Sequence, residues 1–239
     1  MLIAWNAIAP EKGEFLRDEV GAYLPKNEIE EAIRSALIFY LIKKDKALEN
    51  SVKRLILSTD TRPKLKNLAK AVAQMVFEHY PIEITLPQKI YLPEEGIQKV
   101  AIERFDYAKK EFVERFESEV FKGTIEDFAI ESDNLQRIKT ALLSYARGLA
   151  EQEHKELEGT ILEPYIVEIQ NLIANEWQHT LRIGAWTKTP YKGDLLFFWR
   201  IKEVREKLLR EFRLDIRPKD ILFVPKFKEF LGWSEWRED

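Results

Sequence analysis

The stretch FVERFESEVFKGTIEDFAI, residues 112–130, decides the fold class of this chain. Apolar and charged residues alternate along it, and a period of two is typical of a strand that buries one face. The stretches PIEITLPQKIYL at residues 81–92 and IQKVAIERF at residues 97–105 show the same pattern between proline or glycine breaks. The sequence therefore predicts strands between residues 82 and 130, with the turn of the clearest hairpin at Lys122 and Gly123.

Helical periodicity lies on both sides of this strand region. Apolar residues recur every three to four positions in segments that we expect to be helices. These are residues 27–41 with Asn27 as N-cap, residues 65–79, residues 135 to about 159, residues 164–177 and residues 201–212.

Three apolar stretches near the end of the chain are expected to be strands: LLFFW at residues 195–199, ILFVP at 221–225 and the tail FLGW at 230–233. The resulting order of helix, strands, helices, strand, helix and strand favours an α+β fold, in which helices cover antiparallel sheet segments, over a doubly wound parallel sheet. We expect a domain boundary near residue 130, which divides the chain into residues 1–130 and 131–239.

Composition limits the classes of protein to consider. The 239 residues are 45% hydrophobic, enough for a substantial core, and contain no cysteine, so disulfides, thiolate nucleophiles and cysteine zinc sites are excluded. The apolar start MLIAWNAIAP is too short to cross a bilayer, and we expect a cytoplasmic protein with no membrane contact. A charged content of 33% with abundant Lys, Glu and Arg resembles thermophile usage.

Charge is distributed unevenly along the chain. Residues 182–228 contain 13 Lys or Arg and 6 Asp or Glu, a net +7, so the rest of the chain carries −10 of the total of −3. This segment could follow a polyanion such as nucleic acid. It could equally form a solvated helical face, because Glu203 and Lys207, and Glu206 and Arg210, have the spacing of i,i+4 ion pairs.

A basic and aromatic loop is the strongest functional signal. The stretch LRIGAWTKTPYKG, residues 181–193, brings Arg182, Lys188 and Lys192 into one neighbourhood with the indole of Trp186. Backbone N–H groups and cations suit a phosphate chain, and an exposed indole suits a stacked base. We therefore expect this loop to contact single-stranded nucleic acid.

Three stretches together resemble the CRISPR-associated RAMP superfamily. They are YLPKNEIEEAIRSALIFYLI at residues 23–42, LRIGAWTKTPYKG at residues 181–193 and PKFKEFLGW at residues 225–233. Their order along the chain is also that of the superfamily. The pattern is most similar to the Csm-type subunit that caps the 3′ end of the guide RNA in type III-A effector complexes.

This resemblance implies a fold, partners and contact residues. The fold would consist of ferredoxin-like (RRM-like) modules with large helical insertions. The chain would bind CRISPR RNA without base specificity, dock on other type III effector subunits and serve antiviral defence, with no metal, cofactor or small-molecule ligand. The positions that match the RNA-contacting motifs are Arg34 on the first helix and Arg182, Gly184, Thr187 and Lys188 in the glycine loop.

Two departures from the superfamily pattern weaken the predicted hold on phosphate. Glu28, Glu30 and Glu31 stand where the superfamily has a small glycine-flanked turn, and they oppose an anion at the helix N-terminus. Ala185 replaces the second loop glycine. A protein-docking scaffold without direct RNA binding, with Trp233 and Trp236 contacting a basic partner, is therefore an alternative.

Catalysis has few candidate residues. The three histidines are His79 at a helix end, His154 in the charged run EQEHKELE, and His179 just before the basic loop. A metal-independent CRISPR endoribonuclease that uses His179 with nearby lysines is the second alternative. No P-loop, HExxH, GxSxG or dinucleotide fingerprint is present, so we expect a non-catalytic protein.

Overall fold

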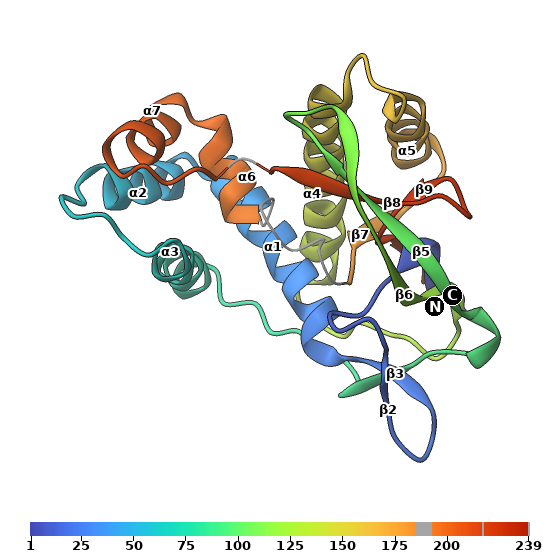
Figure 1. Ribbon diagram of the computed structural model, residues 1–239. Helices are drawn as coiled ribbons and strands as arrows, with labels where there is room; N and C mark the ends of the chain where they lie inside the picture. Colours follow the sequence, from blue (N-terminus) through green and yellow to red (C-terminus); the bar gives the residue numbers. More distant parts are fainter. Residues whose placement is uncertain (185–192, 217, 239) are drawn as a thin grey trace.

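The computed structural model describes residues 1–184, 193–216 and 218–238. Its centre is an antiparallel sheet with the strand order β7-β10-β1-β6-β5-β8-β9 (Figure 1). The strands are β1 (Leu2–Ile8), β5 (Ile97–Asp106), β6 (Glu111–Ile125), β7 (His179–Arg182), β8 (Asp220–Val224), β9 (Glu229–Phe230) and β10 (Trp233–Trp236). A second, small sheet contains β2 (Leu16–Arg17), β3 (Ala22–Pro25) and β4 (Lys89–Tyr91).

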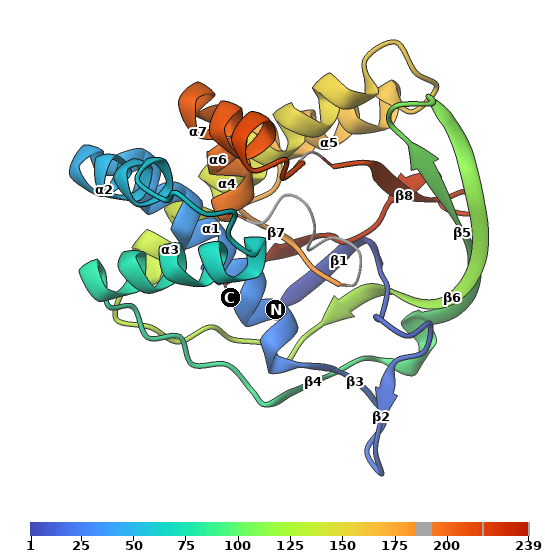
Figure 2. The same ribbon diagram turned by 60° about the vertical axis from the view of Figure 1, so that its left-hand side comes forward.

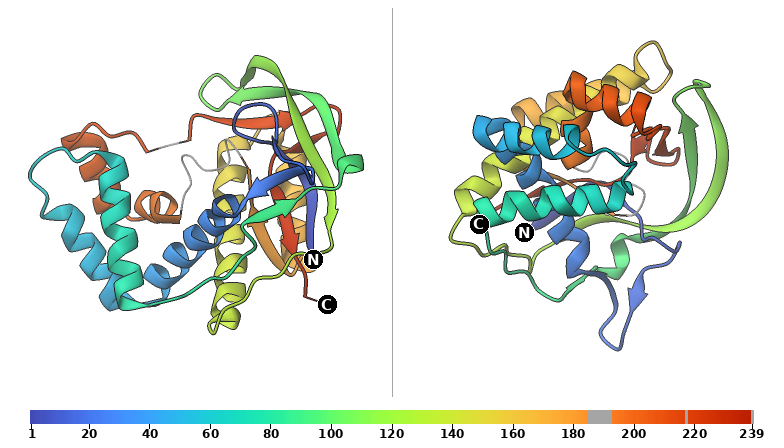
Figure 3. Two further views of the ribbon diagram at one scale, coloured as in Figure 1. Left: turned by 90° about the horizontal axis from the view of Figure 1, so that it is seen from below. Right: turned by 90° about the vertical axis from the view of Figure 1, so that its left-hand side faces the viewer.

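The helices form two groups. Two long helices, α1 (Lys26–Lys44) and α4 (Leu135–Leu157), pack side by side next to the sheet, and α5 (Glu163–Asn175) lies beside α4. At the far end of α1 lie α2 (Lys46–Leu57), α3 (Leu65–His79), α6 (Gly193–Arg200), α7 (Lys202–Glu206) and the π-helical turn η2 (Lys207–Glu211). Figures 1 and 3 show α2 and α3 standing away from the sheet.

The core of the sheet has the ferredoxin-like arrangement that was expected. Along the chain β1, α1, β5, β6, α4 and β10 follow one another as a split βαβ unit, and their strands stand in the order β10-β1-β6-β5. Every neighbouring pair among them is antiparallel. The predicted α+β class with helical insertions is therefore confirmed, since α2 and α3 are inserted after α1, and α5, α6 and α7 after α4.

The sheet curls until β9 returns to β1. Strands β5 and β6 form a long, strongly bent hairpin (Figure 2). The backbone N–H of Gly232 donates to the Ala7 carbonyl at 2.8 Å, and the N–H of Ala7 donates to the Glu229 carboxylate at 2.7 Å. The concave face is filled by a small core of Ala7, Ala9, Val100, Ile102, Val120, Leu222, Val224 and Leu231.

The hairpin turn differs from the prediction. It lies between Asp106 and Glu111, where the Asp106 carboxylate accepts hydrogen bonds from the N–H groups of Ala108 and Lys109. Lys122 and Gly123 instead lie inside β6, with Gly123 opposite Ala4 of β1. The predicted turn at Lys122 and Gly123 is therefore wrong, because strand β6 continues through it.

The helix predictions are mixed. Residues 65–79 form α3 with the predicted bounds. Residues 195–199 lie in α6 and not in a strand, and Leu196, Phe197 and Phe198 among them are buried. Helix α1 starts at Lys26 after the extended Pro25, so Asn27 is inside the helix and not its N-cap. Strand β1 and helix α2 were not predicted.

The expected boundary near residue 130 does not divide the sheet. Strands β1, β5 and β6 come from before it and β7 to β10 from after it. One hydrophobic core likewise runs from Leu2 to Trp236. The structure shows one shared sheet and one main core, and the division into residues 1–130 and 131–239 stays a prediction.

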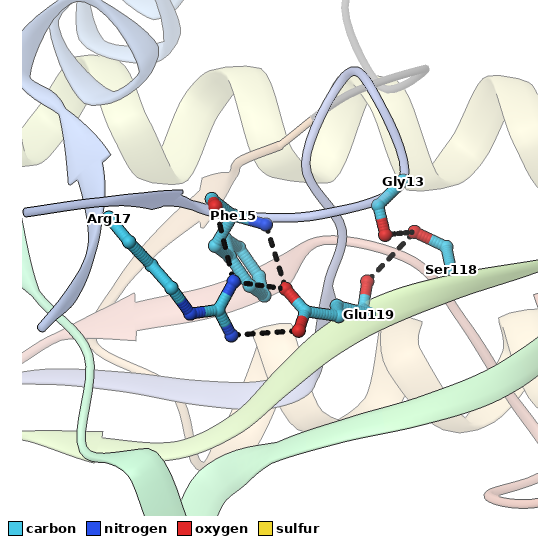
Figure 4. Close-up of polar contacts among 5 residues, drawn as sticks. All are labelled: Gly13, Phe15, Arg17, Ser118 and Glu119. Carbon is cyan, nitrogen blue, oxygen red and sulfur yellow. Dashed lines mark hydrogen bonds and ion pairs between the residues drawn. The ribbon is translucent and has the colours of Figure 1, made fainter.

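An ionic clamp holds the segment after β1 against β6 (Figure 4). Arg17 Nη2 and Nη1 lie 2.7 and 2.9 Å from the two carboxylate oxygens of Glu119. The N–H of Phe15 donates to the same carboxylate at 2.8 Å, and the Ser118 hydroxyl donates to the Gly13 carbonyl at 3.3 Å. The hydrogen bond from Arg17 holds the pKa of Glu119 below its usual value. These contacts hold residues 13–17 against the central hairpin.

Within the described part of the chain, no helix combines the length and the apolar character needed to span a bilayer.

Candidate nucleic-acid interface

Gly184 lies two residues after strand β7, in a conformation that favours glycine. Its φ is +101°, and a Cβ atom there would lie 2.9 Å from the Ala9 carbonyl oxygen and 3.0 Å from Ile8 Cγ2. The backbone of Gly184 thus lies directly against the end of β1. The loop residues expected to contact RNA after it, Trp186, Thr187, Lys188 and Lys192, are outside the described residues.

Arg182 is buried. Its Nη1 lies 2.7 and 2.9 Å from the two carboxylate oxygens of Glu153, its Nε donates to the Leu231 carbonyl at 2.7 Å, and its guanidinium lies 4.7 Å from the ring centroid of Trp233. Burial raises the pKa of the Glu153 carboxyl, and the charge of Arg182 opposes that rise. The pair joins α4 to β7 and the end of the chain. An RNA contact by Arg182 would require this pair to open.

Arg34 faces the inserted helices. Its Nε lies 2.8 Å from Glu30 on the preceding turn, and its guanidinium lies 4.9 Å from the ring centroid of Phe77 in α3. The Arg34 side chain is 39% exposed, so it links α1 to α3 while part of it meets solvent. Its contact with RNA stays a prediction.

The three histidines have local partners. His79 Nε2 lies 3.4 Å from Asp45, and His154 Nε2 lies 3.3 Å from Glu163. His179 is half-buried and lies 5.2 Å, between ring centroids, from Trp236. Burial, with the nearby charge of Lys139, lowers the pKa of His179, so its imidazole is neutral at neutral pH.

The C-terminal tryptophans are part of the core. Trp233 is 0% exposed and Trp236 is 3% exposed, because β10 runs between β7 and β1. The expectation that these two side chains contact a partner protein is therefore wrong. The acidic residues around them gave the tail the appearance of a surface segment.

A cationic group of helices is the feature that sequence reasoning missed. Residues 43–79 contain nine Lys or Arg and four Asp or Glu, a net +5, and residues 202–213 contain five and three, a net +2. Helices α2 and α7 are in contact, Lys207 Nζ donates to the Leu57 carbonyl at 2.7 Å, and Arg62 Nη2 donates to the Arg213 carbonyl at 3.4 Å. We call these two segments together the basic helical lobe.

Most cations of the basic helical lobe lack a carboxylate partner. Lys46 and Lys53 share Glu49, and Lys207 pairs with Glu211. Ten exposed cations form no ion pair with any described residue: Lys43, Lys44, Arg54, Arg62, Lys64, Lys66, Lys70, Lys202, Arg210 and Arg213. The lobe therefore presents uncompensated positive charge to solvent, which a polyanion can neutralise.

The first turn of α3 adds to this charge. It contains no acidic residue, its N-cap Lys64 makes no side-chain cap hydrogen bond, and Lys66 is its second residue. The partial positive charge of the helix N-terminus and these ammonium groups therefore have the same sign. The excess of lysine in residues 43–79 is visible in the sequence. The contact between this segment and residues 202–213, about 150 positions further along the chain, is visible only in the fold.

The face of the sheet that RRM-type proteins use for RNA is closed in this protein. RRM sheets expose aromatic side chains that stack bases. Here the concave face is filled by its own small core and crossed by the return of β9 to β1. Within the described residues no group of three or more acidic or histidine side chains could hold a metal ion. The basic helical lobe is thus the best-supported site for a polyanion.

These features define an α+β protein of ferredoxin-like topology with a separate cationic group of inserted helices. No protein-family model matches the chain. An uncharacterized protein of Aquifex aeolicus (strain VF5) is 37% identical over 246 residues, which cover 100% of this chain and 99% of that protein. The chain belongs to the same family as this A. aeolicus protein. Among solved structures, the crystal structure of T. onnurineus Csm5 is similar with a TM-score of 0.49 and 12% identity, over 93% of this chain and 73% of that one.

Proposed function

We propose that this protein is a non-catalytic RNA-associated subunit of a type III CRISPR effector complex. In this proposal it contributes to guide-RNA binding or 3′-end capping, alongside other effector subunits, in the cytoplasm. The observation that carries the RNA part is the basic helical lobe, where two distant segments bring together ten exposed cations without carboxylate partners among the described residues. Contacts of this kind hold the phosphate backbone and read no bases.

The assignment to CRISPR complexes is supported by three ordered motifs at residues 23–42, 181–193 and 225–233. The ferredoxin-like strand order agrees with them, as does the close packing of Gly184 on β1 at the start of the basic loop. The described residues of these motifs lie in β3 and α1, in β7 and just after it, and in the segment from the end of β8 to the start of β10. Lys188 and Lys192 would extend the contact from the lobe along the loop in this proposal.

The test is binding of single-stranded RNA across a salt series. The variant Lys64→Gln, Lys66→Gln, Lys70→Gln removes three exposed ammonium groups from the start of α3. We expect its affinity for RNA to fall by about tenfold or more at low salt. The slope of log affinity against log salt should decrease by about 2, since each phosphate contact to a single strand contributes about 0.7.

The matched control removes three exposed lysines outside the lobe, Lys12, Lys109 and Lys219. The overall change in net charge is the same, so a difference between the two triple variants reports position and not total charge. Equal losses in both variants, or wild-type affinity in the lobe variant, would contradict the proposal.

A further inference from the structure

A cleft of about 310 Å³ lies between α5, the strands β1 and β6, and the turn before β9. In Figure 1, α5 and β9 lie across α4 from α2 and α3, so the cleft is distinct from the basic helical lobe. Its lining includes Trp5, Asn6, Tyr165, Phe227, Glu168 and Glu176.

The side-chain amide of Asn6 opens into this cleft. Asn6 is 7% exposed and lines the cleft, yet its side chain forms no hydrogen bond with any described residue. The neighbouring buried carboxylate of Glu229, in contrast, accepts from the Ala7 N–H at 2.7 Å and pairs with Lys122. The amide of Asn6 is therefore available to a hydrogen-bonding ligand atom in the cleft.

The walls of the cleft are aromatic and suited to a flat cation. Trp5 is 39% exposed and is stacked on Trp177 with a centroid distance of 6.3 Å and an interplanar angle of 8°. Rings of this region already lie against cations, with the Arg237 guanidinium 5.7 Å from the Trp5 centroid and Lys122 Nζ 5.2 Å from that of Phe227. A guanidinium is planar and stacks on such rings.

The rim charge also favours a cation. Glu168 on α5 and Glu176 directly after it are exposed, and neither forms an ion pair with a described residue. Lys122 is neutralised by Glu229, which leaves Lys228 as the single cation of the lining without a carboxylate partner in the described chain. Two free carboxylates against one free ammonium attract a basic group and repel phosphate.

We propose that this cleft binds an arginine side chain on an exposed segment of a partner protein. The guanidinium lies among Trp5, Tyr165 and Phe227. It donates one hydrogen bond to the side-chain oxygen Oδ1 of Asn6 and pairs with Glu168 or Glu176. This docking site is independent of the proposed RNA contact, since the two surfaces share no residue.

The probe is the peptide Ac-Gly-Arg-Gly-NH2, titrated into the full-length protein while the indole N–H signal of Trp5 is followed by NMR. Peptides with citrulline or lysine in place of arginine serve as ligand controls. We expect a saturable shift with arginine, weaker binding with lysine, and none with citrulline, which keeps the shape and loses the charge. A tripeptide arginine should bind with a dissociation constant of about 1 to 10 mM.

Two variants test the residues. The first is the single variant Asn6→Leu, and the second is the double variant Glu168→Gln, Glu176→Gln. Each should weaken arginine binding by about tenfold. The exposed pair Glu95→Gln with Glu126→Gln, away from the cleft, is the matched control and should bind as the wild type does. The glutamate variants change only exposed positions, so they stay informative if Asn6→Leu fails to fold.

Three results would overturn the proposal: no saturable shift with the arginine peptide, equal binding of citrulline, or preferential binding of adenosine monophosphate at the same indole signal. RNA affinity should be unchanged in the cleft variants. Loss of RNA binding in the lobe variant and loss of arginine binding in the cleft variants are thus separate outcomes.

Discussion

The sheet half and the basic helical lobe use their charged residues in opposite ways. In the sheet half, the part of the chain outside the lobe, several cations have carboxylate partners within the protein: Arg17 has Glu119, Arg182 has Glu153 and Lys122 has Glu229. In the lobe, ten exposed cations have no such partner among the described residues. A cation with an internal carboxylate contributes to the fold, whereas a cation without one remains available to an external anion. The net charge of −3 conceals this division.

The largest expected effect comes from breaking the buried pair of the sheet half. Glu153→Ala leaves the Arg182 guanidinium buried at 7% exposure without its carboxylate. We expect the free energy of unfolding to fall by about 3 to 5 kcal/mol, measured by urea denaturation. Arg54→Ala in the lobe should change it by less than about 0.5 kcal/mol. A loss below about 1 kcal/mol for Glu153→Ala would mean that Arg182 is not held as described.

A smaller loss of stability in the sheet half is expected from a substitution at Gly184. Gly184→Ala places a Cβ atom 2.9 Å from the Ala9 carbonyl oxygen at a φ of +101°. We expect a loss of stability of about 2 to 3 kcal/mol, because steric overlap adds to backbone strain. Gly159→Ala is the control, since Gly159 has a φ of +73° and nothing within 4 Å of its Cβ position. It isolates strain alone, at about 1 to 2 kcal/mol, and equal losses would refute the close packing of Gly184.

The smallest expected effect is on how the stability contributed by the Arg17–Glu119 clamp depends on pH. The pKa of Glu119 is lowered in the folded protein, so the contribution of its ionised form to stability is present above the unfolded pKa. That contribution is lost as pH falls through the lower folded pKa. Glu119→Gln should therefore be less stable than the wild type at pH 7 by about 1 kcal/mol or less, and the difference should shrink in acid. Thermal unfolding across pH measures this, and a pH-independent difference would contradict it.

Sequence reasoning succeeded where periodicity was long and local. Residues 65–79 show an uninterrupted helical stripe and form α3, and the alternation in residues 97–105 and 112–121 marks β5 and β6. It failed where burial on all sides removes the period. Leu196, Phe197 and Phe198 are all buried inside a helix, and β1 loses its alternation from Asn6 to Ile8, where consecutive residues are buried.

The site was predicted only in part for a related reason. The motif around Gly184 is local, and its close packing against β1 agrees with a special role for glycine. Arg182 has the same sequence context as a surface cation, and only the fold brings Glu153 to it. The basic helical lobe needs contacts between Arg62 and Arg213 and between Lys207 and Leu57, and no local pattern encodes contacts across such separations.

The most direct test of the division between the two halves is to map where RNA lies on the protein. Single-stranded RNA carrying photoreactive uridines would be crosslinked to the full-length protein at low salt, and the modified peptides identified by mass spectrometry. We predict crosslinks in residues 43–79 and 202–213, with none in the β5–β6 hairpin or in β10. Crosslinks concentrated on the sheet half, with the lobe unmodified, would contradict the claim that unpaired cations on the inserted helices form the RNA-binding surface.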